Sequence, residues 1–144
     1  PWFIVAGDND NSKIIRTARE VNDAKPNWVT SKITEKLLKT VGSKGKIVRL
    51  GLAFKPDIDD LRESPAVNVV AKLLHAGYDV SAVEPNITSH DLINLVKLDQ
   101  VDNFNVIAIL VPHKEFSDPL IKSFLKKNEA LDFCGLLSDD HNRI

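Results

Sequence analysis

Apolar residues recur at a helical period through the first third of the chain and predict one long helix there. The apolar positions share one helical face and are Ile15, Ala18, Val29, Ile33 and Leu37. The pattern runs from Asn11 or Ser12, either of which could cap the first turn, to about Val41. Because the phase continues across Pro26, we expect a single helix kinked at this proline; a break just before Pro26 is the alternative.

From residue 46 onward the pattern changes to short apolar runs alternating with helical segments. Strands are expected at residues 46–54, 78–83, 105–111 and 130–133, and helices at 65–76, 89–96 and 116–127. Strands that are separated by helices imply parallel neighbours with right-handed crossovers. The predicted fold class is therefore α/β, a long N-terminal helix followed by a Rossmann-like, doubly wound, mainly parallel sheet. We expect residues 1–45 to form the lead-in and long helix, and residues 46–144 to form the sheet domain.

The loop after the first strand carries charge next to a predicted helix start. Residues 51–64 read Gly-Leu-Ala-Phe-Lys-Pro-Asp-Ile-Asp-Asp-Leu-Arg-Glu-Ser. Ser64 suits a helix N-cap, the proline after it suits the first helical position, and Gly51 allows a close backbone approach. In doubly wound sheets ligands bind beyond the carboxyl ends of the strands, where Lys55 and Arg62 would lie. These features predict an anion site, most often one for phosphate.

Another interpretation of the same loop is purely structural. Lys55 and Arg62 would then pair with the acidic residues around them, which are Asp57, Asp59, Asp60 and Glu63. The loop has no GxGxxG pattern, so a dinucleotide fingerprint is not supported. The acidic run matches no calcium loop, and the histidines show no metal-ligand spacing, so no metal site is predicted. His113 follows a predicted strand end, where a cleft contact could form, but nothing else assigns it to a site.

Composition narrows the possible functions. The chain has 144 residues, with 19 basic and 20 acidic side chains, and no basic stripe, so nucleic acid is not an expected partner. Its longest apolar runs are too short to span a bilayer, and we expect no membrane partner. The single cysteine excludes an internal disulfide and suits a reducing, cytoplasmic location. Cys134 follows a predicted strand without a histidine nearby, which favours a structural thiol over a nucleophile. The chain begins at Pro1 and contains no methionine, so we expect it to be part of something longer.

The loop at 51–64 resembles a motif of the UDP-glucose/GDP-mannose dehydrogenase family, whose members oxidise nucleotide sugars to uronic acids. The family pattern G-x-x-[FY]-K-x-x-x-x-D-x-R-x-S is matched by Gly51, Phe54, Lys55, Asp60, Arg62 and Ser64. Residues 15–23 together with Pro26 are similar to the central helix that joins the two halves of these enzymes. Residues 83–86 resemble the step after the family's second strand, and residues 1–4 resemble those that follow its catalytic cysteine segment. Within the family, the chain looks most like the subgroup that acts on UDP-N-acetyl-D-mannosamine.

That resemblance implies the C-terminal portion of an NAD-dependent UDP-sugar 6-dehydrogenase, which makes uronic acid precursors for surface polysaccharides. The NAD-binding domain and the nucleophilic cysteine would lie outside this chain, so we expect no catalytic residue and no activity from it alone. By the same resemblance Phe54 and Lys55 would contact the UDP-sugar, Arg62 would reach NAD across an interdomain cleft, and the long helix would form a homodimer. The family often has a basic residue where Cys134 stands, which leaves an anion contact from the last strand in doubt.

Two alternatives stay open at this stage. The sugar could be UDP-glucose or UDP-N-acetylglucosamine, since much of the sugar pocket would come from the other half of the enzyme. The chain could also be a non-catalytic Rossmann-like module whose long helix serves protein association.

Overall fold

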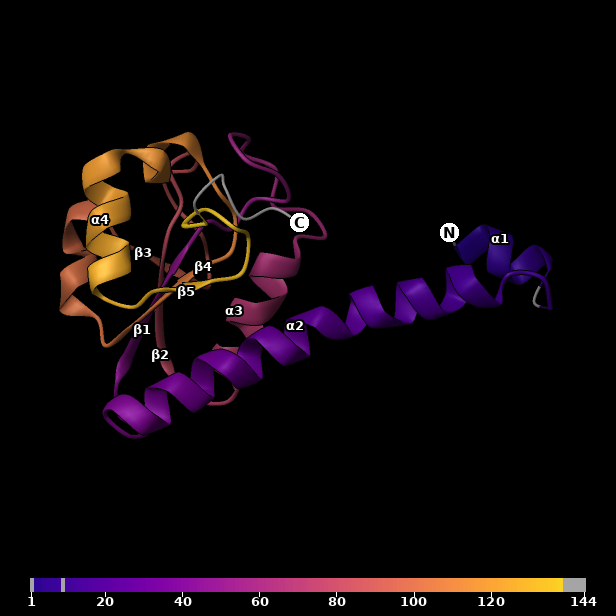
Figure 1. Cartoon of the computed structure of the whole chain (residues 1–144), viewed down its shortest axis with the longest axis horizontal. Coiled ribbons are helices and arrows are strands. Elements are labelled where there is room, and N and C mark those ends of the chain that lie inside the picture. The colour runs from indigo at the N-terminus through magenta and orange to yellow at the C-terminus, as the bar shows by residue number, and fades with distance from the viewer. Residues whose placement is uncertain (1, 9, 139–144) are drawn as a thin grey trace.

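The computed structural model describes residues 2–8 and 10–138, which form an α/β domain with a helical arm (Figure 1). The arm consists of α1 (Trp2–Gly7) and α2 (Lys13–Thr40). The remaining elements are, in chain order, β1 (Lys46–Leu50), α3 (Pro65–His75), β2 (Asp79–Val83), β3 (Asn94–Leu95), the 3₁₀ helix η1 (Leu98–Asn103), β4 (Val106–Ile109), the 3₁₀ helix η2 (Lys114–Ser117), α4 (Pro119–Lys127) and β5 (Leu131–Asp132).

The five strands form one parallel sheet in the order β3-β2-β1-β4-β5. The chain builds outward from β1 to β3 on one side, then crosses over to β4 and β5 on the other. Strand order therefore reverses between β1 and β4, and the loops at their carboxyl ends flank the crevice where such sheets bind ligands. This topology confirms the predicted α/β, doubly wound, parallel fold.

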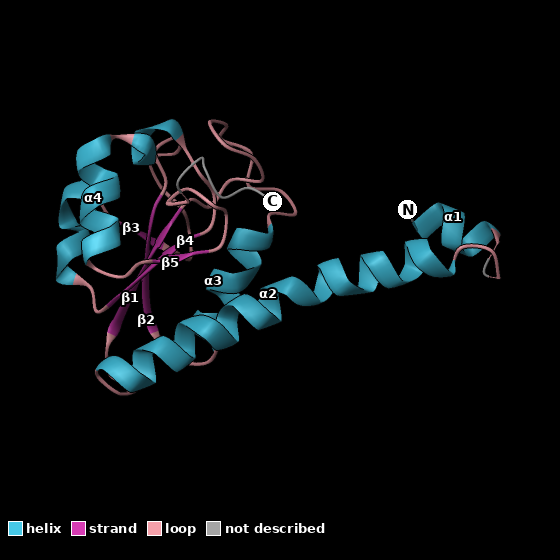
Figure 2. Cartoon of the chain, viewed as in Figure 1, coloured by secondary structure: helices cyan, strands magenta, loops and turns pink. Residues whose placement is uncertain are grey.

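Helices cover both faces of the sheet, as Figure 2 shows. On one face α2 and α3 pack over Ile47 of β1, and on the other α4 and the 3₁₀ helices pack over Val48 and Leu50. Since successive strand residues point to opposite faces, β1 is buried on both sides from its second residue onward. The central strand is consequently a fixed base for the loop that follows it.

The long helix α2 is continuous through Pro26, which confirms the prediction of one helix in preference to two. Its second half is buried through Val29, Ile33 and Leu37, which join the core under the sheet. Its first half projects away from the sheet and carries α1 at its far end (Figure 1). Ala18 is exposed there, so the predicted apolar face is a core face only where the sheet lies beneath it. The division at residues 45 and 46 stays a prediction.

The helix predicted at residues 89–96 is wrong. The segment is irregular and ends in the short strand β3, where Val96 N donates to Ala82 O at 2.8 Å and Asn94 Nδ2 donates to Ser81 Oγ at 2.9 Å. A short apolar run does not distinguish a helix from an edge strand, and here pairing with β2 decides. The expected strand at 46–54 also ends earlier, at Leu50, because the backbone turns at Gly51.

Candidate functional site

The loop from β1 to α3 begins with a close backbone contact at Gly51. Gly51 has φ +87°, and a Cβ on it would lie 2.5 Å from Val111 Cβ and 2.7 Å from Val111 O. Only glycine fits such a position, because it tolerates positive φ and brings no side chain. The expectation of a close approach at Gly51 is confirmed, with the chain after β4 as the neighbour.

The other end of the loop is fixed by Ser64, as predicted. Its Oγ accepts a hydrogen bond from Ala66 N at 3.1 Å, which caps α3, and donates to Leu52 O at 2.6 Å. One buried hydroxyl thus caps the helix and ties the loop's last residue to its second residue. The hydrogen bond from Ser64 to Leu52 therefore closes the loop at its base, and residues 53–63 form the segment between the two tied residues.

Phe54 and Lys55 lie on the outside of this loop and are exposed. The Lys55 ammonium lies 5.8 Å from the centre of the Phe54 ring, and within the described part of the chain no carboxylate forms an ion pair with it. The structural interpretation of the loop, in which Lys55 pairs with a neighbouring acid, is thus not what the described residues show. Lys55 therefore carries a charge that no described carboxylate pairs with, on the loop that follows the carboxyl end of β1.

Arg62 behaves differently, because it pairs within the loop. Its Nε and Nη2 donate to Asp60 Oδ1 and Oδ2 at 2.9 and 2.8 Å, while its side chain remains 88% exposed. The Arg62 guanidinium holds the pKa of Asp60 at about 2. Asp60 O also accepts from Phe54 N at 2.8 Å, so Asp60 links the two predicted contact residues. The role of Arg62 toward NAD stays a prediction.

Two hollows meet at Phe54. A small apolar pocket of about 180 Å³ lies between the sheet and α2 and is lined by Phe54, Val111 and Phe133 among others. A larger, more polar hollow of about 630 Å³ lies between α2 and the start of α3 and includes Arg19, Phe54 and Ser64. The middle of α2 therefore lines the same region as the loop. Sequence reasoning had assigned α2 no part in the site.

A buried pair behind the loop was also missed. Glu84, directly after β2, and His113, after β4, are both buried, and His113 Nε2 lies 3.0 Å from Glu84 Oε2. The same carboxylate oxygen accepts from Leu52 N at 2.7 Å and Ala53 N at 3.0 Å. The strand-end position of both residues was the available signal, since parallel strands end at one edge of the sheet.

Glu84 should make the stability of the chain depend on pH. Burial raises the pKa of Glu84, but hydrogen bonds from His113, Leu52, Asn86 and Ala53 outweigh it and bring the pKa from 4.5 to about 2. A carboxyl with a depressed folded-state pKa stabilises the fold above its unfolded pKa, and that contribution is lost as pH falls from about 5 toward 2. A shift of this size corresponds to about 3 kcal/mol.

Urea unfolding at several pH values tests this expectation. Glu84→Gln should be less stable than the unchanged chain at pH 7, and the difference should shrink as the pH falls. Asp59→Asn is the control, because Asp59 is an exposed carboxylate of the same loop, where surface charges contribute little to stability. A constant difference between Glu84→Gln and the unchanged chain from pH 7 to pH 3 would contradict the assignment.

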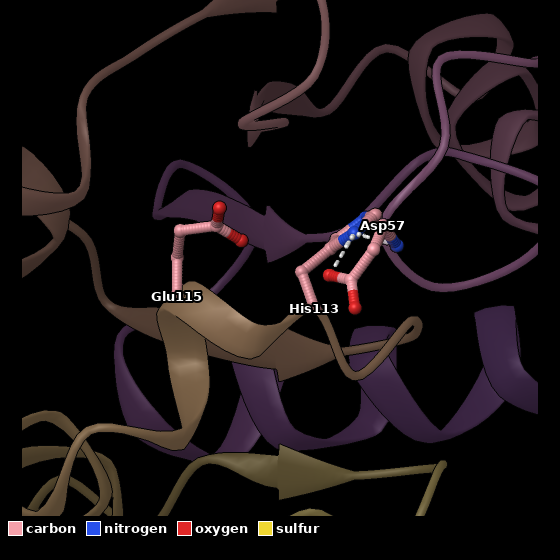
Figure 3. Close-up of side chains that lie close together, drawn as sticks. All are labelled: Asp57, His113 and Glu115. Carbon is pink, nitrogen blue, oxygen red and sulfur yellow. Dashed lines mark hydrogen bonds and ion pairs between the residues drawn. The ribbon is translucent and has the colours of Figure 1, made fainter.

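Asp57, His113 and Glu115 come close enough together to raise the question of a metal (Figure 3). His113 Nδ1 already accepts from Asp57 N at 2.9 Å, and its Nε2 faces Glu84, so both ring nitrogens are used within the protein. Asp57 Oδ1 accepts from Lys114 N at 2.9 Å. A metal would have to displace these bonds, which argues for a hydrogen-bonded junction between two loops and against a metal centre.

Cys134 lies in a turn after β5. Its Sγ donates to Asp132 Oδ1 at 3.4 Å, and burial, followed by the nearby Asp132 charge, raises the pKa of the thiol to about 12. A thiol with this pKa is not a nucleophile at neutral pH, in agreement with the structural role expected for it.

Comparison with known sequences identifies relatives. The profile described as "UDP-glucose/GDP-mannose dehydrogenase family, UDP binding domain" matches residues 48–139. A UDP-N-acetyl-D-mannosamine dehydrogenase from Campylobacter jejuni is 47% identical over 143 residues, covering 93% of this chain and 33% of that protein. The enzyme of the same name from Escherichia coli K12 is 42% identical over 130 residues, covering 81% and 31%. The chain thus spans about a third of the length of these curated relatives.

The solved structures that are similar to this chain include enzymes of the same kind. The UDP-N-acetyl-mannosamine dehydrogenase of Staphylococcus aureus aligns with a TM-score of 0.71 at 32% identity, over 82% of this chain and 28% of that one. The UDP-D-ManNAc dehydrogenase of Pyrococcus horikoshii aligns with a TM-score of 0.69 at 28% identity, over 85% of this chain and 29% of that one.

Within the described residues, no helix combines the length and apolarity that crossing a membrane requires.

Proposed function

The chain belongs to the UDP-glucose/GDP-mannose dehydrogenase family, and from this premise we propose that it is the UDP-sugar-binding part of an NAD-dependent UDP-N-acetyl-D-mannosamine 6-dehydrogenase. The observation that carries the proposal is the exposed Lys55 ammonium, which pairs with no carboxylate among the described residues, on the loop that follows β1 at the switch point of the sheet. A diphosphate is doubly anionic, and an exposed lysine ammonium offers it a point charge. The Phe54 backbone lies beside that charge and would contact the same ligand.

We place NAD mainly on a part of the enzyme outside this chain, with Arg62 reaching toward it. In sheets that bind a dinucleotide, an acidic residue after the second strand hydrogen-bonds the ribose. Glu84 stands at that place, but its carboxylate is buried and its oxygens accept from donors of the protein itself. Arg62 keeps guanidinium N–H groups beyond the two that Asp60 occupies, so it fits an anionic group of the cofactor. NAD supplies the hydride acceptor; this chain would help to bind it.

We further propose that the helical arm forms the homodimer contact. Large apolar side chains of α1 and the first half of α2 are exposed, and they are Trp2, Phe3, Ile4, Ile14 and Val21. A run of exposed apolar side chains on a projecting helix is typical of an interaction surface. A cytoplasmic location, in keeping with the single cysteine, belongs to the same proposal.

Replacing Lys55 should weaken nucleotide binding without unfolding the chain. We expect Lys55→Ala to raise the Kd for UDP by about 10- to 100-fold, as for loss of a charge-assisted contact. The measurement is a UDP titration followed by heteronuclear NMR, which also detects weak binding. Lys72→Ala is the control, since Lys72 is exposed near the far end of α3. Equal affinity of Lys55→Ala and the unchanged chain would remove Lys55 from the site.

The same titration tests the non-catalytic alternative but not the alternative sugars. UDP-glucose and UDP-N-acetylglucosamine share the UDP moiety, so they would bind through the same loop, and only comparison of the complete enzymes on each sugar distinguishes them. A chain that dimerises but shows no response to UDP would favour the non-catalytic association module.

A further inference from the structure

We propose that His113, held by Glu84, is the positioning residue that sets the Phe54–Lys55 segment for binding the UDP-sugar diphosphate. This inference deepens the proposed function and rests on it. Neither Glu84 nor His113 belongs to the loop itself. Glu84 follows β2, and His113 follows β4. They act from behind the loop, through main-chain groups on either side of Lys55.

Glu84 fixes the near side of that segment. Its Oε2 accepts from the main-chain N–H groups of Leu52 and Ala53 at 2.7 and 3.0 Å, and its Oε1 accepts from Asn86 N at 3.1 Å and Asn86 Nδ2 at 3.2 Å. These two loop N–H groups directly precede Phe54. They face an anion that belongs to the protein, so the loop is already ordered around a negative charge at its base. Because these N–H groups already donate to Glu84, a bound diphosphate would contact the exposed side of the loop, where Lys55 lies.

His113 fixes the far side. The main-chain N–H of Asp57 can only donate, and it lies 2.9 Å from His113 Nδ1, so Nδ1 carries no proton. Asn86 Nδ2, also a donor, lies 3.2 Å from the same nitrogen. The proton of the neutral ring is therefore on Nε2, which donates to the Glu84 carboxylate at 3.0 Å. One buried ring thus transmits the position of Glu84 to the backbone of Asp57.

A second bond locks the same junction. Asp57 has φ +61°, a left-handed conformation that costs free energy for a residue other than glycine. The conformation is held because its N–H donates to His113 and its Oδ1 accepts from Lys114 N at 2.9 Å. Three residues, Phe54 to Pro56, are left between the pinned positions 53 and 57. Lys55 is the middle one, so few backbone conformations are open to the residue that carries the ammonium.

This arrangement affects affinity through preorganisation. A loop that is ordered before the ligand arrives loses less conformational entropy when it binds. Freeing Asp57 from His113 should leave Lys55 chemically unchanged but let its backbone move, and we expect a Kd for UDP about threefold to tenfold higher. The effect should be smaller than that of Lys55→Ala, because the charge is still present.

Two substitutions at one position separate positioning from simple packing. In His113→Asn the amide oxygen lies near the place of Nδ1 and can still accept from Asp57 N, but the donor to Glu84 is lost. In His113→Gln the amide nitrogen reaches the place of Nε2 and can still donate to Glu84, but the acceptor for Asp57 is lost. Both remove the ring, so a general loss of packing would affect them alike.

UDP titrations followed by NMR should show His113→Gln binding about threefold to tenfold more weakly than the unchanged chain. His113→Asn keeps the direct bond to Asp57 N and loses only its hold by Glu84, so its loss of affinity should be clearly smaller. Full affinity in His113→Gln, or an equal loss in both variants, overturns the positioning role. If Lys55→Ala weakens binding while His113→Gln does not, only this inference fails. If the unchanged chain does not bind UDP, the proposed function fails with it.

A measurement on the unchanged chain tests the same inference even if the His113 variants do not fold. The ring-nitrogen chemical shifts of His113 should report a neutral ring protonated at Nε2, and the Asp57 amide should exchange with solvent much more slowly than an open loop amide. An Nδ1-protonated ring, or rapid exchange at Asp57, overturns the inference without any substitution.

Discussion

Gly51→Ala is expected to destabilise the chain by about 3 kcal/mol or more, because it combines a steric clash with backbone strain. The added methyl would lie 2.5 Å from Val111 Cβ and 2.9 Å from Val111 Cα, and φ at this position is +87°. Neither neighbour is a flexible side-chain end that can turn away. To relieve the clash, the chain after β4 would have to move away from β1, which lies at the centre of the sheet.

Urea or thermal unfolding measures this loss, and the chain offers a matched control. Gly77 has φ +82°, almost the same as Gly51, but a Cβ there would meet nothing within 4 Å. Gly77→Ala should therefore cost only the backbone term, about 1 kcal/mol. Equal losses in the two variants would show that the contact with Val111 contributes nothing.

The overall architecture could be read from the sequence because it depends on local signals. Periodic apolar residues predicted α2, and the alternation of strand and helix patterns predicted the parallel sheet. Prediction failed where a local pattern was ambiguous. Residues 89–96 contain a short apolar run, and only their pairing with β2 makes part of them a strand. The exposure of the first half of α2 likewise depends on how far the sheet extends beneath it.

The candidate site could be predicted in part for the same reason. Charge beside a predicted helix start points to Lys55 and Arg62, and the family resemblance implies Phe54; all three fall within one loop, and their roles stay predictions. Glu84 and His113 are 29 residues apart, and nothing local to either shows that β2 and β4 bring them together on the two sides of β1. His113 follows a predicted strand end and Glu84 follows the predicted strand at 78–83, but their pairing needs the three-dimensional arrangement of the strands. Residues such as Glu84 and His113, which hydrogen-bond the backbone of the loop from other strands, are therefore harder to predict from sequence than the residues of the loop itself.

Arg49→Met is expected to stabilise the chain by about 1–3 kcal/mol, the reverse of what a substitution in a buried strand usually does. Arg49 is the fourth of the five residues of β1 and is fully buried. Its Nη2 donates to Ala66 O at 2.8 Å, but its Nε and Nη1 have no hydrogen-bond partner among the described residues. Burial lowers the pKa of Arg49 only to about 9, so the guanidinium is still charged at pH 7.

A buried charge with incomplete hydrogen bonding costs free energy that an apolar side chain of similar length does not. The strand partners in register with Arg49 are Ala82 and Ala108, whose small side chains leave room for an unbranched chain on this face of the sheet. Methionine is unbranched and flexible, so it can occupy the space of the arginine stem without overpacking. The Ala66 carbonyl loses one donor, which offsets part of the gain.

Urea unfolding at pH 7 compares Arg49→Met with Lys46→Met. Lys46 is the exposed first residue of the same strand, so its substitution should change the free energy of unfolding by no more than about 0.5 kcal/mol. A loss of stability in Arg49→Met would mean that the guanidinium and its bond to Ala66 contribute more than its desolvation costs. In that case the buried arginine would be a net source of stability at the centre of the sheet.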